Sequence, residues 1–538
     1  MKNKALLCGL IGALGIPLLA DNPLPPIEKV EITPHAGFKV NDQPFFPILG
    51  WLQSARTYPR LNALGFNVIM GNHNNLPPSP EMAENAKAAG LYAVPHFDGK
   101  ARNNPYIFAW LDLDEPDITS REAMAKVEPG PGLRVNKKAP PANMVDGNLR
   151  SSSVLDPMAD ASVTIELDNP VTVSSFALSI LANKPEQKVM TTPSEIVLVG
   201  DGTELLKMTI TDKSEAQKFD LPAPATFKSL QLRVTAVEAG ERVWGQIREL
   251  EGFNAEGENV LKSPPVGVVR RLPEVSQARY REMKENDPGR PVFLTLTSRY
   301  LERYEQWHKV PVAEMRAHYP GWAKAADSLG FDIYAIYGYS KPEWLLDNID
   351  AVRELRKMAP GKPIYAWIEC ANYGSQQKRD LKVLPAHTRA EVWMSIIAGA
   401  RAIGYFTHVF TPFNAFAPDD EMQAEMKRIN NQITRLAPEL LAQPADDHVS
   451  ISFDQGVEGH CMATVTGRRV TVVAQNLSLG GKDGLGGKTA RGRIEVKNLP
   501  PGMTVEVVDE NRTITSSNGW FEDSFDGLQE HIYRVMIP

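Results

Sequence analysis

Two short segments decide the fold. Residues 109–117 read AWLDLDEPD and residues 364–370 read IYAWIEC, and each apolar, aromatic run ends close to a glutamate, Glu115 or Glu369. Such runs are typical of buried strands, and a barrel of eight parallel strands carries its working carboxylates at the carboxyl ends of those strands. Two glutamates in these positions fit the acid–base cleavage of a glycosidic bond.

The chain around these segments alternates short apolar runs with amphipathic ones, starting near residue 31. This alternation predicts an α/β fold, a (β/α)8 TIM barrel with a parallel sheet. The predicted strands are 45–51, 66–70, 91–95, 107–113, 291–297, 332–337, 363–369 and 402–407. The clearest predicted helices are 56–64, 81–89, 273–286 and 420–441.

Two stretches break the alternation. Between about residues 130 and 255 the chain shows short alternating strands separated by turn residues, which predicts a β-sandwich inserted after the fourth barrel strand. Residues 446–538 again show only strand and turn signals and predict a C-terminal β-sandwich. The barrel would then be split into two parts, 31–128 and 258–442.

The first twenty residues predict export. Lys2 and Lys4 precede an apolar stretch that ends in Ala20, which is the pattern of a secretory signal peptide over 1–20. We therefore expect a periplasmic or secreted protein with no membrane insertion once the signal is removed. The formal net charge of −7 disfavours nucleic acid as a partner. Only Cys370 and Cys461 lie beyond the signal, in different predicted domains, so we expect a fold that needs no disulfide.

The predicted carboxyl ends of the strands supply candidate substrate-binding residues. Aromatic rings offer flat faces to sugar rings, while Asn, His, Arg and Tyr side chains donate hydrogen bonds to hydroxyl groups. The candidates are Trp51, Asn72, His73, His96, Asp98, Asp114, Arg299, Tyr337, Asn372, Tyr405 and His408. The expected substrate is an oligosaccharide or polysaccharide.

Other chemistries find weaker support in the sequence. His73, His96 and His408 could converge on a metal, but the chain has no HExxH motif and no His-x-His at the first strand. No glycine-rich phosphate loop or dinucleotide fingerprint follows a strand, and no GxSxG elbow is present. We therefore expect no catalytic metal and no cofactor.

With these residues in view, the chain resembles the clan of retaining glycoside hydrolases built on a (β/α)8 barrel, the beta-galactosidase and cellulase-like clan. The opening 37–50, GFKVNDQPFFPILG, is similar to the start of beta-galactosidase-like members. The resemblance implies that Glu115 is the acid/base and Glu369 the nucleophile. The chain departs from the clan at Asp114, where an Asn that contacts the sugar 2-hydroxyl is usual.

The inserted segment resembles the discoidin family of sugar-binding sandwiches, also called factor 5/8 C-type domains. The matching features are NMVDGN at 143–148, the strand 163–167 and GQIRELEG at 245–252. The tryptophan often found soon after the DG pair is missing. The resemblance implies either glycan binding or a structural role, and it allows a structural calcium ion in the sandwich.

The sequence thus predicts an exported glycoside hydrolase that acts with retention through Glu369 and Glu115. One alternative is a carbohydrate-binding protein on a barrel without catalysis. Another is an inverting hydrolase that uses Asp114, Asp117 or Asp332 in place of Glu115.

Overall fold

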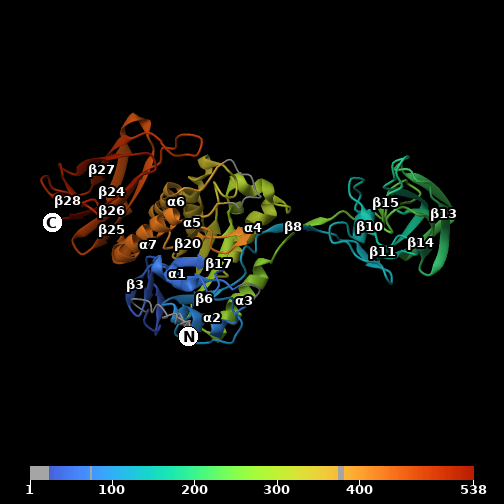
Figure 1. The fold of residues 1–538 in the computed structure, drawn as a ribbon, viewed down its shortest axis with the longest axis horizontal. Helices are drawn as coiled ribbons and strands as arrows, with labels where there is room; N and C mark the ends of the chain where they lie inside the picture. The colour runs from blue at the N-terminus through green and yellow to red at the C-terminus, as the bar shows by residue number, and fades with distance from the viewer. Residues whose placement is uncertain (1–23, 73–75, 373–380, 411, 538) are drawn as a thin grey trace, which may run out of the picture. The chain divides into compact units, whose positions relative to one another are not determined.

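A computed structural model describes residues 24–72, 76–372, 381–410 and 412–537 of the chain. The described residues form two compact units. The first, the barrel unit, holds the described residues up to Ile118, then Arg270–His308 and those from Val312 onward. The second, the sandwich unit, holds Thr119–Val269 and Lys309–Pro311 (Figure 1). The predicted signal peptide lies outside the described residues.

The barrel unit is built on a parallel sheet, which has eight strands in the described part of the chain. Its order is β6-β5-β4-β20-β19-β18-β17-β7. The strands are β4 (Ile48–Trp51), β5 (Val68–Met70), β6 (Tyr92–Val94), β7 (Trp110–Leu111), β17 (Val292–Thr297), β18 (Ser328–Asp332), β19 (Ile364–Glu369) and β20 (Ala402–Phe406). Two parallel bridges, Ala93 with Ile107 and His96 with Leu111, link the two edges and nearly close the sheet into a barrel.

Seven α-helices accompany these strands in the described residues. They are α1 (Tyr58–Ala63), α2 (Ser79–Ala88), α3 (Pro273–Asn286), α4 (Val312–Ala323), α5 (Asp347–Met358), α6 (Pro385–Ala398) and α7 (Asp420–Leu440). Residues 95–109, between β6 and β7, form bends and turns in place of a helix. The architecture is therefore mixed α/β with a nearly closed parallel barrel. None of the described helices is long and apolar enough to cross a membrane.

One predicted strand was wrong. The sixth strand is Ser328–Asp332 (β18), and the predicted range 332–337 is mostly a turn segment. Gly330 hides this strand in the sequence, because a glycine weakens a strand pattern. The structure explains the glycine, since a Cβ at position 330 would lie 1.9 Å from the ring of Tyr365. The carboxyl end of the strand is consequently Asp332 and not Tyr337.

Small antiparallel sheets complete the barrel unit near its first strands. One consists of β1 (Val30–Ile32), β2 (Phe38–Val40) and β3 (Gln43–Phe45), and a short ribbon consists of β21 (Val409–Phe410) and β22 (Phe413–Asn414). Phe38 of β2 packs against the rings of Phe108 and Phe293, with centroids 5.4 and 5.7 Å away. This aromatic contact closes the amino-terminal floor of the barrel.

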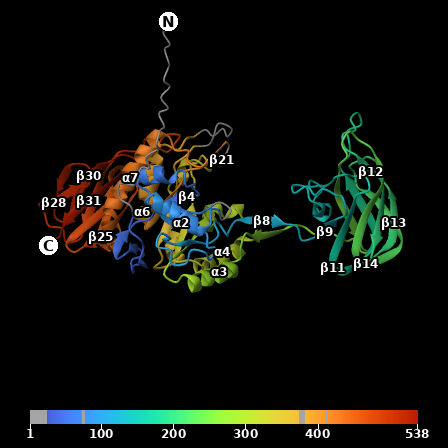
Figure 2. The same ribbon diagram turned by 60° about the horizontal axis from the view of Figure 1, so that its bottom comes forward.

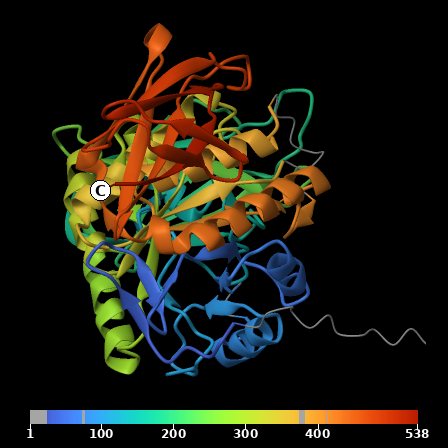
Figure 3. The same cartoon turned by 90° about the vertical axis from the view of Figure 1, so that its left-hand side faces the viewer.

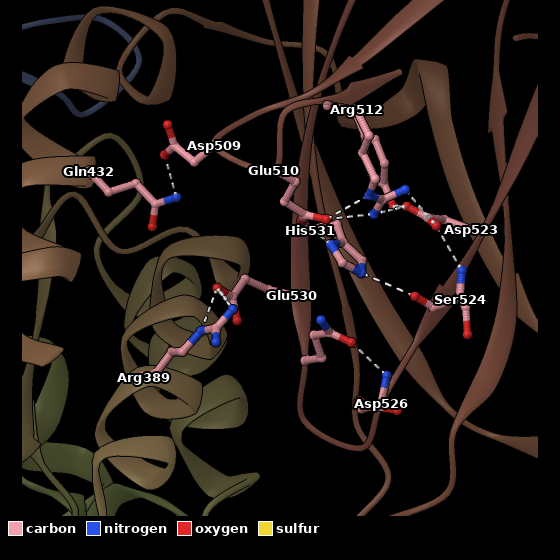
Figure 4. Close-up of polar contacts among 12 residues, drawn as sticks. Arg389, Gln432, Asp509, Glu510, Arg512, Asp523, Ser524, Asp526, Glu530 and His531 are labelled. Carbon is pink, nitrogen blue, oxygen red and sulfur yellow. Dashed lines mark hydrogen bonds and ion pairs between the residues drawn. The ribbon is translucent and has the colours of Figure 1, made fainter. Parts of the chain in front are cut away.

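The C-terminal strands form two antiparallel sheets, of order β23-β25-β26-β31-β28-β29 and β24-β27-β30. Their bounds are β23 (Gln443–Pro444), β24 (Val449–Phe453), β25 (Gly459–Thr466), β26 (Arg469–Asn476), β27 (Ala490–Val496), β28 (Thr504–Val507), β29 (Arg512–Thr515), β30 (Trp520–Phe525) and β31 (Glu530–Met536). They pack on α6 and α7, as Figures 2 and 3 show. Arg389 of α6 pairs with Glu530 at 2.8 Å, and Gln432 of α7 donates to Asp509 at 2.8 Å (Figure 4).

The sandwich unit is antiparallel throughout its main sheet. Its strands are β9 (Lys126–Pro129), β10 (Ser153–Leu155), β11 (Ser162–Ile180), β12 (Thr192–Gly200), β13 (Thr203–Thr209), β14 (Gln217–Glu238) and β15 (Gly245–Phe253). Their order is β10-β15-β11-β14-β12-β13, with β9 beside β11. The strand 163–167 of the sequence analysis is part of one long strand, β11. Strands β8 (Thr119–Glu122) and β16 (Val266–Val269) are the first and last strands of the segment Thr119–Val269, and they pair with each other.

Candidate active site

Glu115 lies just beyond β7, where the chain turns sharply. Its φ of 52° is in the left-handed region, which non-glycine residues adopt at a cost. The turn is held by a hydrogen bond from the Glu115 amide to the Thr295 carbonyl, 3.0 Å. Arg270 Nη1 lies 3.7 Å from Glu115 Oε2, and the side chain is 22% exposed. Glu115 thus presents a partly solvated carboxyl at the carboxyl end of the barrel.

Asp332, at the end of β18, faces Glu115. The two carboxyl groups are in hydrogen-bonding contact. Burial raises the pKa of Asp332 well above its usual range, and the charge and hydrogen bond of Glu115 raise it further. The increase favours the protonated form of Asp332, which can donate a hydrogen bond to Glu115. Sequence reasoning gave Asp332 only as an alternative catalytic carboxyl, because the strand that delivers it was misplaced.

Asp114 and Asp117 complete this group of four carboxyls. Burial and the Glu115 charge raise the pKa of Asp114 to about 7, against the opposing charge of Arg270. Burial also raises the pKa of Asp117 to about 6, although the Thr297 hydroxyl and amide donate to it at 2.6 and 2.9 Å. Asp117 has no exposed surface, so it acts as a buried support for the turn after β17.

Glu369 ends β19, as predicted, but it is fully buried. Its carboxylate accepts hydrogen bonds from the amides of Ile336, at 2.8 Å, and Tyr337, at 2.5 Å. Burial raises the pKa of Glu369 to about 7, while its hydrogen bonds to Glu391 and to these two amides oppose the increase. In this conformation Glu369 anchors the turn segment after β18 and offers no surface to a substrate.

Glu391 of α6 lies behind Glu369 and forms a second carboxyl pair with it. Burial and the Glu369 charge raise the pKa of Glu391 well above its usual range. Glu391 is also without exposed surface, and the Glu369 amide donates to its Oε2 at 3.3 Å. The sequence offered no signal for this partner, because Glu391 falls inside a helix rather than at a strand end.

Tyr334 connects the two pairs. Burial raises its pKa well above the usual range, and the charges of Asp332, Asp114, Glu115 and Glu369 all add to the increase. Its ring packs on Phe406 with centroids 4.8 Å apart. Both carboxyl pairs therefore lie near the ring of Tyr334, which is itself in contact with Phe406.

An aromatic pocket opens beside this ring, at the carboxyl ends of β4 and β20. Its volume is about 860 Å³, within the usual range of small-molecule sites. The ring-bearing residues among its lining are Trp51, Phe406, His408, Phe410 and Phe413. Two of these, Phe410 and Phe413, are 59% and 67% exposed. Exposed rings beside a cleft provide the flat apolar faces on which sugar rings stack.

The remaining predicted residues lie in different parts of the barrel unit. Trp51 and His408 line the aromatic pocket, and Asp114 belongs to the carboxyl group. Asn72 Oδ1 instead accepts from the amide of His96, and Asp98 accepts from Ser79 at the start of α2, so both have structural partners.

Several others lie away from the carboxyl group or are engaged locally. The Tyr405 hydroxyl donates to Asn430 of α7, so it points outward from the barrel. Asn372 Oδ1 accepts from the amide of Val383, and the Arg299 carbonyl contacts the ring of His308. Tyr337 contributes its amide to Glu369, and its side chain is nearly buried. His73 lies outside the described residues.

The two described histidines of the metal alternative have other surroundings in the structure. Among the described residues no group of three or more His, Cys, Asp or Glu side chains is placed to hold a metal ion. Burial lowers the pKa of His96 to about 4, and its Nδ1 already contacts Asn72. His73, the third histidine of the metal alternative, is outside the description.

The acidic residues that bear on the predicted structural calcium are Glu249 and Asp146 of the sandwich unit. Glu249 of β15 is 2% exposed, and its Oε2 has no hydrogen-bond partner within the described chain. Burial raises its pKa to about 8, and the charge of nearby Asp146 contributes. The carboxyl oxygens of Glu249 and Asp146 are donors of the kind that calcium prefers.

The sandwich unit also has an aromatic hollow that sequence reasoning missed. It has a volume of about 450 Å³, and its lining includes Trp244, Arg134, Asn136, Asp156 and Gln246. Arg134 and Asp156 form an ion pair at 2.7 Å on one side of it. The prediction looked for a tryptophan after the DG pair, whereas Trp244 immediately precedes β15.

Comparison with known proteins gives limited likenesses. No protein-family model matches the chain, and no curated protein matches it. The family 32 carbohydrate-binding module of C. perfringens NanJ, solved with galactose, is 16% identical and covers 25% of this chain and 98% of its own, with a TM-score of 0.20. The family 32 module of AlyQ, solved with 4,5-unsaturated mannuronic acid, is 18% identical and covers 25% of this chain and 99% of its own, with a TM-score of 0.20. The family 32 module of Streptococcus pneumoniae EndoD is 15% identical and covers 25% of this chain and 99% of its own, with a TM-score of 0.21. At these identities and TM-scores the matches do not establish what this chain binds.

Proposed function

We propose that the barrel unit is a glycoside hydrolase in which Glu115 donates a proton to the departing glycosidic oxygen. The observation that carries this proposal is the Glu115–Asp332 contact, in which a partly exposed carboxyl is hydrogen-bonded to a buried one whose pKa is raised. The pair lies next to Tyr334, whose ring packs on Phe406 of the aromatic pocket. One sugar ring can therefore bind in the pocket while the neighbouring glycosidic bond lies near Glu115. The substrate is an oligosaccharide or polysaccharide.

Asp332 serves as a positioning residue in this proposal. Its carboxyl is in hydrogen-bonding contact with Glu115, whereas carboxyls that flank a glycosidic bond are about 5–5.5 Å apart in retaining enzymes and about 6.5–9.5 Å apart in inverting ones. The two groups are therefore too close to act as acid and nucleophile on opposite sides of a sugar. Asp332 instead orients Glu115 and supplies or accepts its proton.

The retaining mechanism requires a change of conformation. It makes Glu369 the nucleophile, but Glu369 has no exposed surface and is bonded to two amides. The turn segment 333–338 would have to leave Glu369 before it could reach an anomeric carbon. Attack by water, with net inversion, needs no such movement, and Asp114 is the neighbouring carboxyl able to accept a proton from that water.

A panel of aryl glycosides tests the proposal. The purified protein should hydrolyse at least one of them, and Glu115→Gln should reduce the rate while Glu274→Gln, an exposed glutamate of α3, should not. Proton NMR of the first-formed product reports retention or inversion. Absence of turnover on a broad panel, together with saturable sugar binding, would instead establish the non-catalytic carbohydrate-binding alternative.

We further propose that the sandwich unit binds glycan through the Trp244 hollow. A ring beside an Arg–Asp pair offers a stacking face and charged hydrogen-bond partners to one sugar. Saturable binding to a glycan array should be lost in Trp244→Ala and retained in Val243→Ala, its exposed neighbour. Equal binding by both variants would remove Trp244 from the site. Export by the predicted signal, to the periplasm or the medium, agrees with a polymeric substrate.

A further inference from the structure

A second cavity of the barrel unit has no role in the proposed hydrolysis. It has a volume of about 550 Å³ and lies where β19 and β20 begin, at the opposite ends of the strands from Glu115. Five basic side chains are among its lining residues: Arg353, Arg356, Lys357, Lys362 and Arg401. Lys357 is paired with Glu354 at 2.5 Å. Within the described chain the other four form no ion pair.

Arg401 is the most deeply placed of these side chains. It is 6% exposed, and its Nη1 donates to the carbonyl of the preceding Ala400 at 3.1 Å. Burial and the Arg356 charge lower its pKa to about 10, against the opposing charge of Asp446. Arg401 thus remains charged at neutral pH in a place where charge is costly without a counter-ion.

The chain makes room for a second guanidinium beside it. Arg356 Nη1 donates to the Ala398 carbonyl at the end of α6, 3.0 Å away. Gly399 has a φ of 115°, and a Cβ at that position would lie 2.5 Å from Arg356 Nη1. A glycine is therefore required both by the backbone and by the guanidinium that lies over it.

Backbone carbonyls supply the remaining contacts of this cavity. Lys362 Nζ donates to the carbonyls of Ala323 and Ala326, at 2.8 and 2.6 Å. Carbonyls near helix ends attract cations, but they carry no net charge and cannot neutralise four of them. The protein as a whole has a net charge of −7, so the local excess of positive charge is not a general property of its surface.

We propose that this cavity binds a tetrahedral oxyanion, a sulfate or phosphate group, between Arg356 and Arg401. Guanidinium groups bind such anions with paired, charge-assisted hydrogen bonds, and the anion would relieve the repulsion among the four cations. Lys362 and Arg353 add charge at the wall of the cavity. The anion is either free in solution or is a sulfate ester carried by a glycan.

Isothermal titration of the intact protein with sodium sulfate, at constant ionic strength set with chloride, tests the proposal. We expect saturable binding of one sulfate and an affinity about tenfold lower in Arg356→Gln and in Arg401→Gln. Arg353→Gln, at the exposed rim, should weaken binding less. Arg281→Gln, an exposed arginine of α3, is the matched control and should bind as the wild type does.

A second titration, with a sulfated oligosaccharide and its unsulfated counterpart, separates the two sources. Tighter binding of the sulfated sugar than of inorganic sulfate assigns the site to a glycan, and equal or weaker binding assigns it to a free anion. Arg356 is exposed, so its replacement should not disturb the core. The test therefore remains valid even if the Arg401→Gln variant fails to fold. No saturable binding of sulfate or phosphate, or an unchanged affinity in Arg356→Gln, would overturn the proposal. Either result leaves the hydrolase proposal unaffected.

Discussion

The two carboxyl pairs of the barrel unit have similar chemistry and different access. Glu115 lies just beyond β7 and Asp332 ends β18, with β17 between these two strands, and the Glu115 side chain is 22% exposed. Glu369 and Glu391 have no exposed surface, and Glu369 is bonded to two backbone amides. In both pairs burial and the charge of the partner raise the pKa of one carboxyl, which favours its protonated form. Position at a strand end therefore does not by itself make a glutamate available to a substrate.

The difference assigns separate roles to the pairs. A buried carboxylate that accepts from successive amides fixes a backbone segment, here 333–338, which carries Tyr334 toward Glu115. A partly exposed carboxyl held by a protonated neighbour is suited to proton transfer. On this account Glu369 shapes the site and Glu115 works in it.

The largest expected effect is that of Glu369→Ala. The substitution leaves two buried amides and Glu391 without their partner, so the free energy of unfolding should fall by about 3–5 kcal/mol. Urea denaturation measures the loss, and Glu369→Gln, which keeps the shape, should lose less. Added azide should not restore turnover. A stable Glu369→Ala protein whose activity returns with azide would identify Glu369 as the nucleophile. Glu369 would then take part in the reaction and would not only shape the site.

Asp332→Asn should have the next largest effect, on catalysis rather than on stability. It should lower kcat/KM by about ten- to a hundredfold, because Glu115 loses its proton partner but remains in place. The wild-type rate should decline as pH increases through the raised pKa of Asp332, since loss of that proton turns a hydrogen bond into a repulsion. A pH–rate profile of the variant should lack this decline. An identical profile in both proteins would exclude Asp332 from the reaction.

The smallest expected effect concerns the sandwich unit, where Glu249 and Asp146 form a third group of carboxyls. If calcium binds at Glu249 and Asp146, a chelator should lower the unfolding temperature of this unit and leave hydrolysis unchanged. Calcium at a hundredfold excess over its Kd would add about 2.7 kcal/mol of stability. Differential scanning calorimetry should show the shift in the wild type and not in Glu249→Gln. Loss of activity on chelation, restored by zinc, would instead indicate a catalytic metal.

The sequence was sufficient for the order of the strands and for the position of Glu115. It was not sufficient for Asp332, because Gly330 broke the apolar pattern of β18 and moved the predicted strand by several residues. It also could not indicate the burial of Glu369, which depends on amides of residues 336 and 337 and on Glu391 of a helix. Tyr405 was placed in the site because it lies in a strand, but its side chain faces α7. Such pairings join distant parts of the chain and leave no local pattern.

The dependence of rate on leaving group tests the role of Glu115 most directly. Rates of wild type and Glu115→Gln should be compared on aryl glycosides whose phenols span a wide range of acidity. If Glu115 protonates the departing oxygen, the variant should lose about 10²–10⁴-fold on poorly acidic phenols and little on strongly acidic ones, so its rate should depend steeply on leaving-group pKa. A uniform loss across the series, or no loss, would contradict the account.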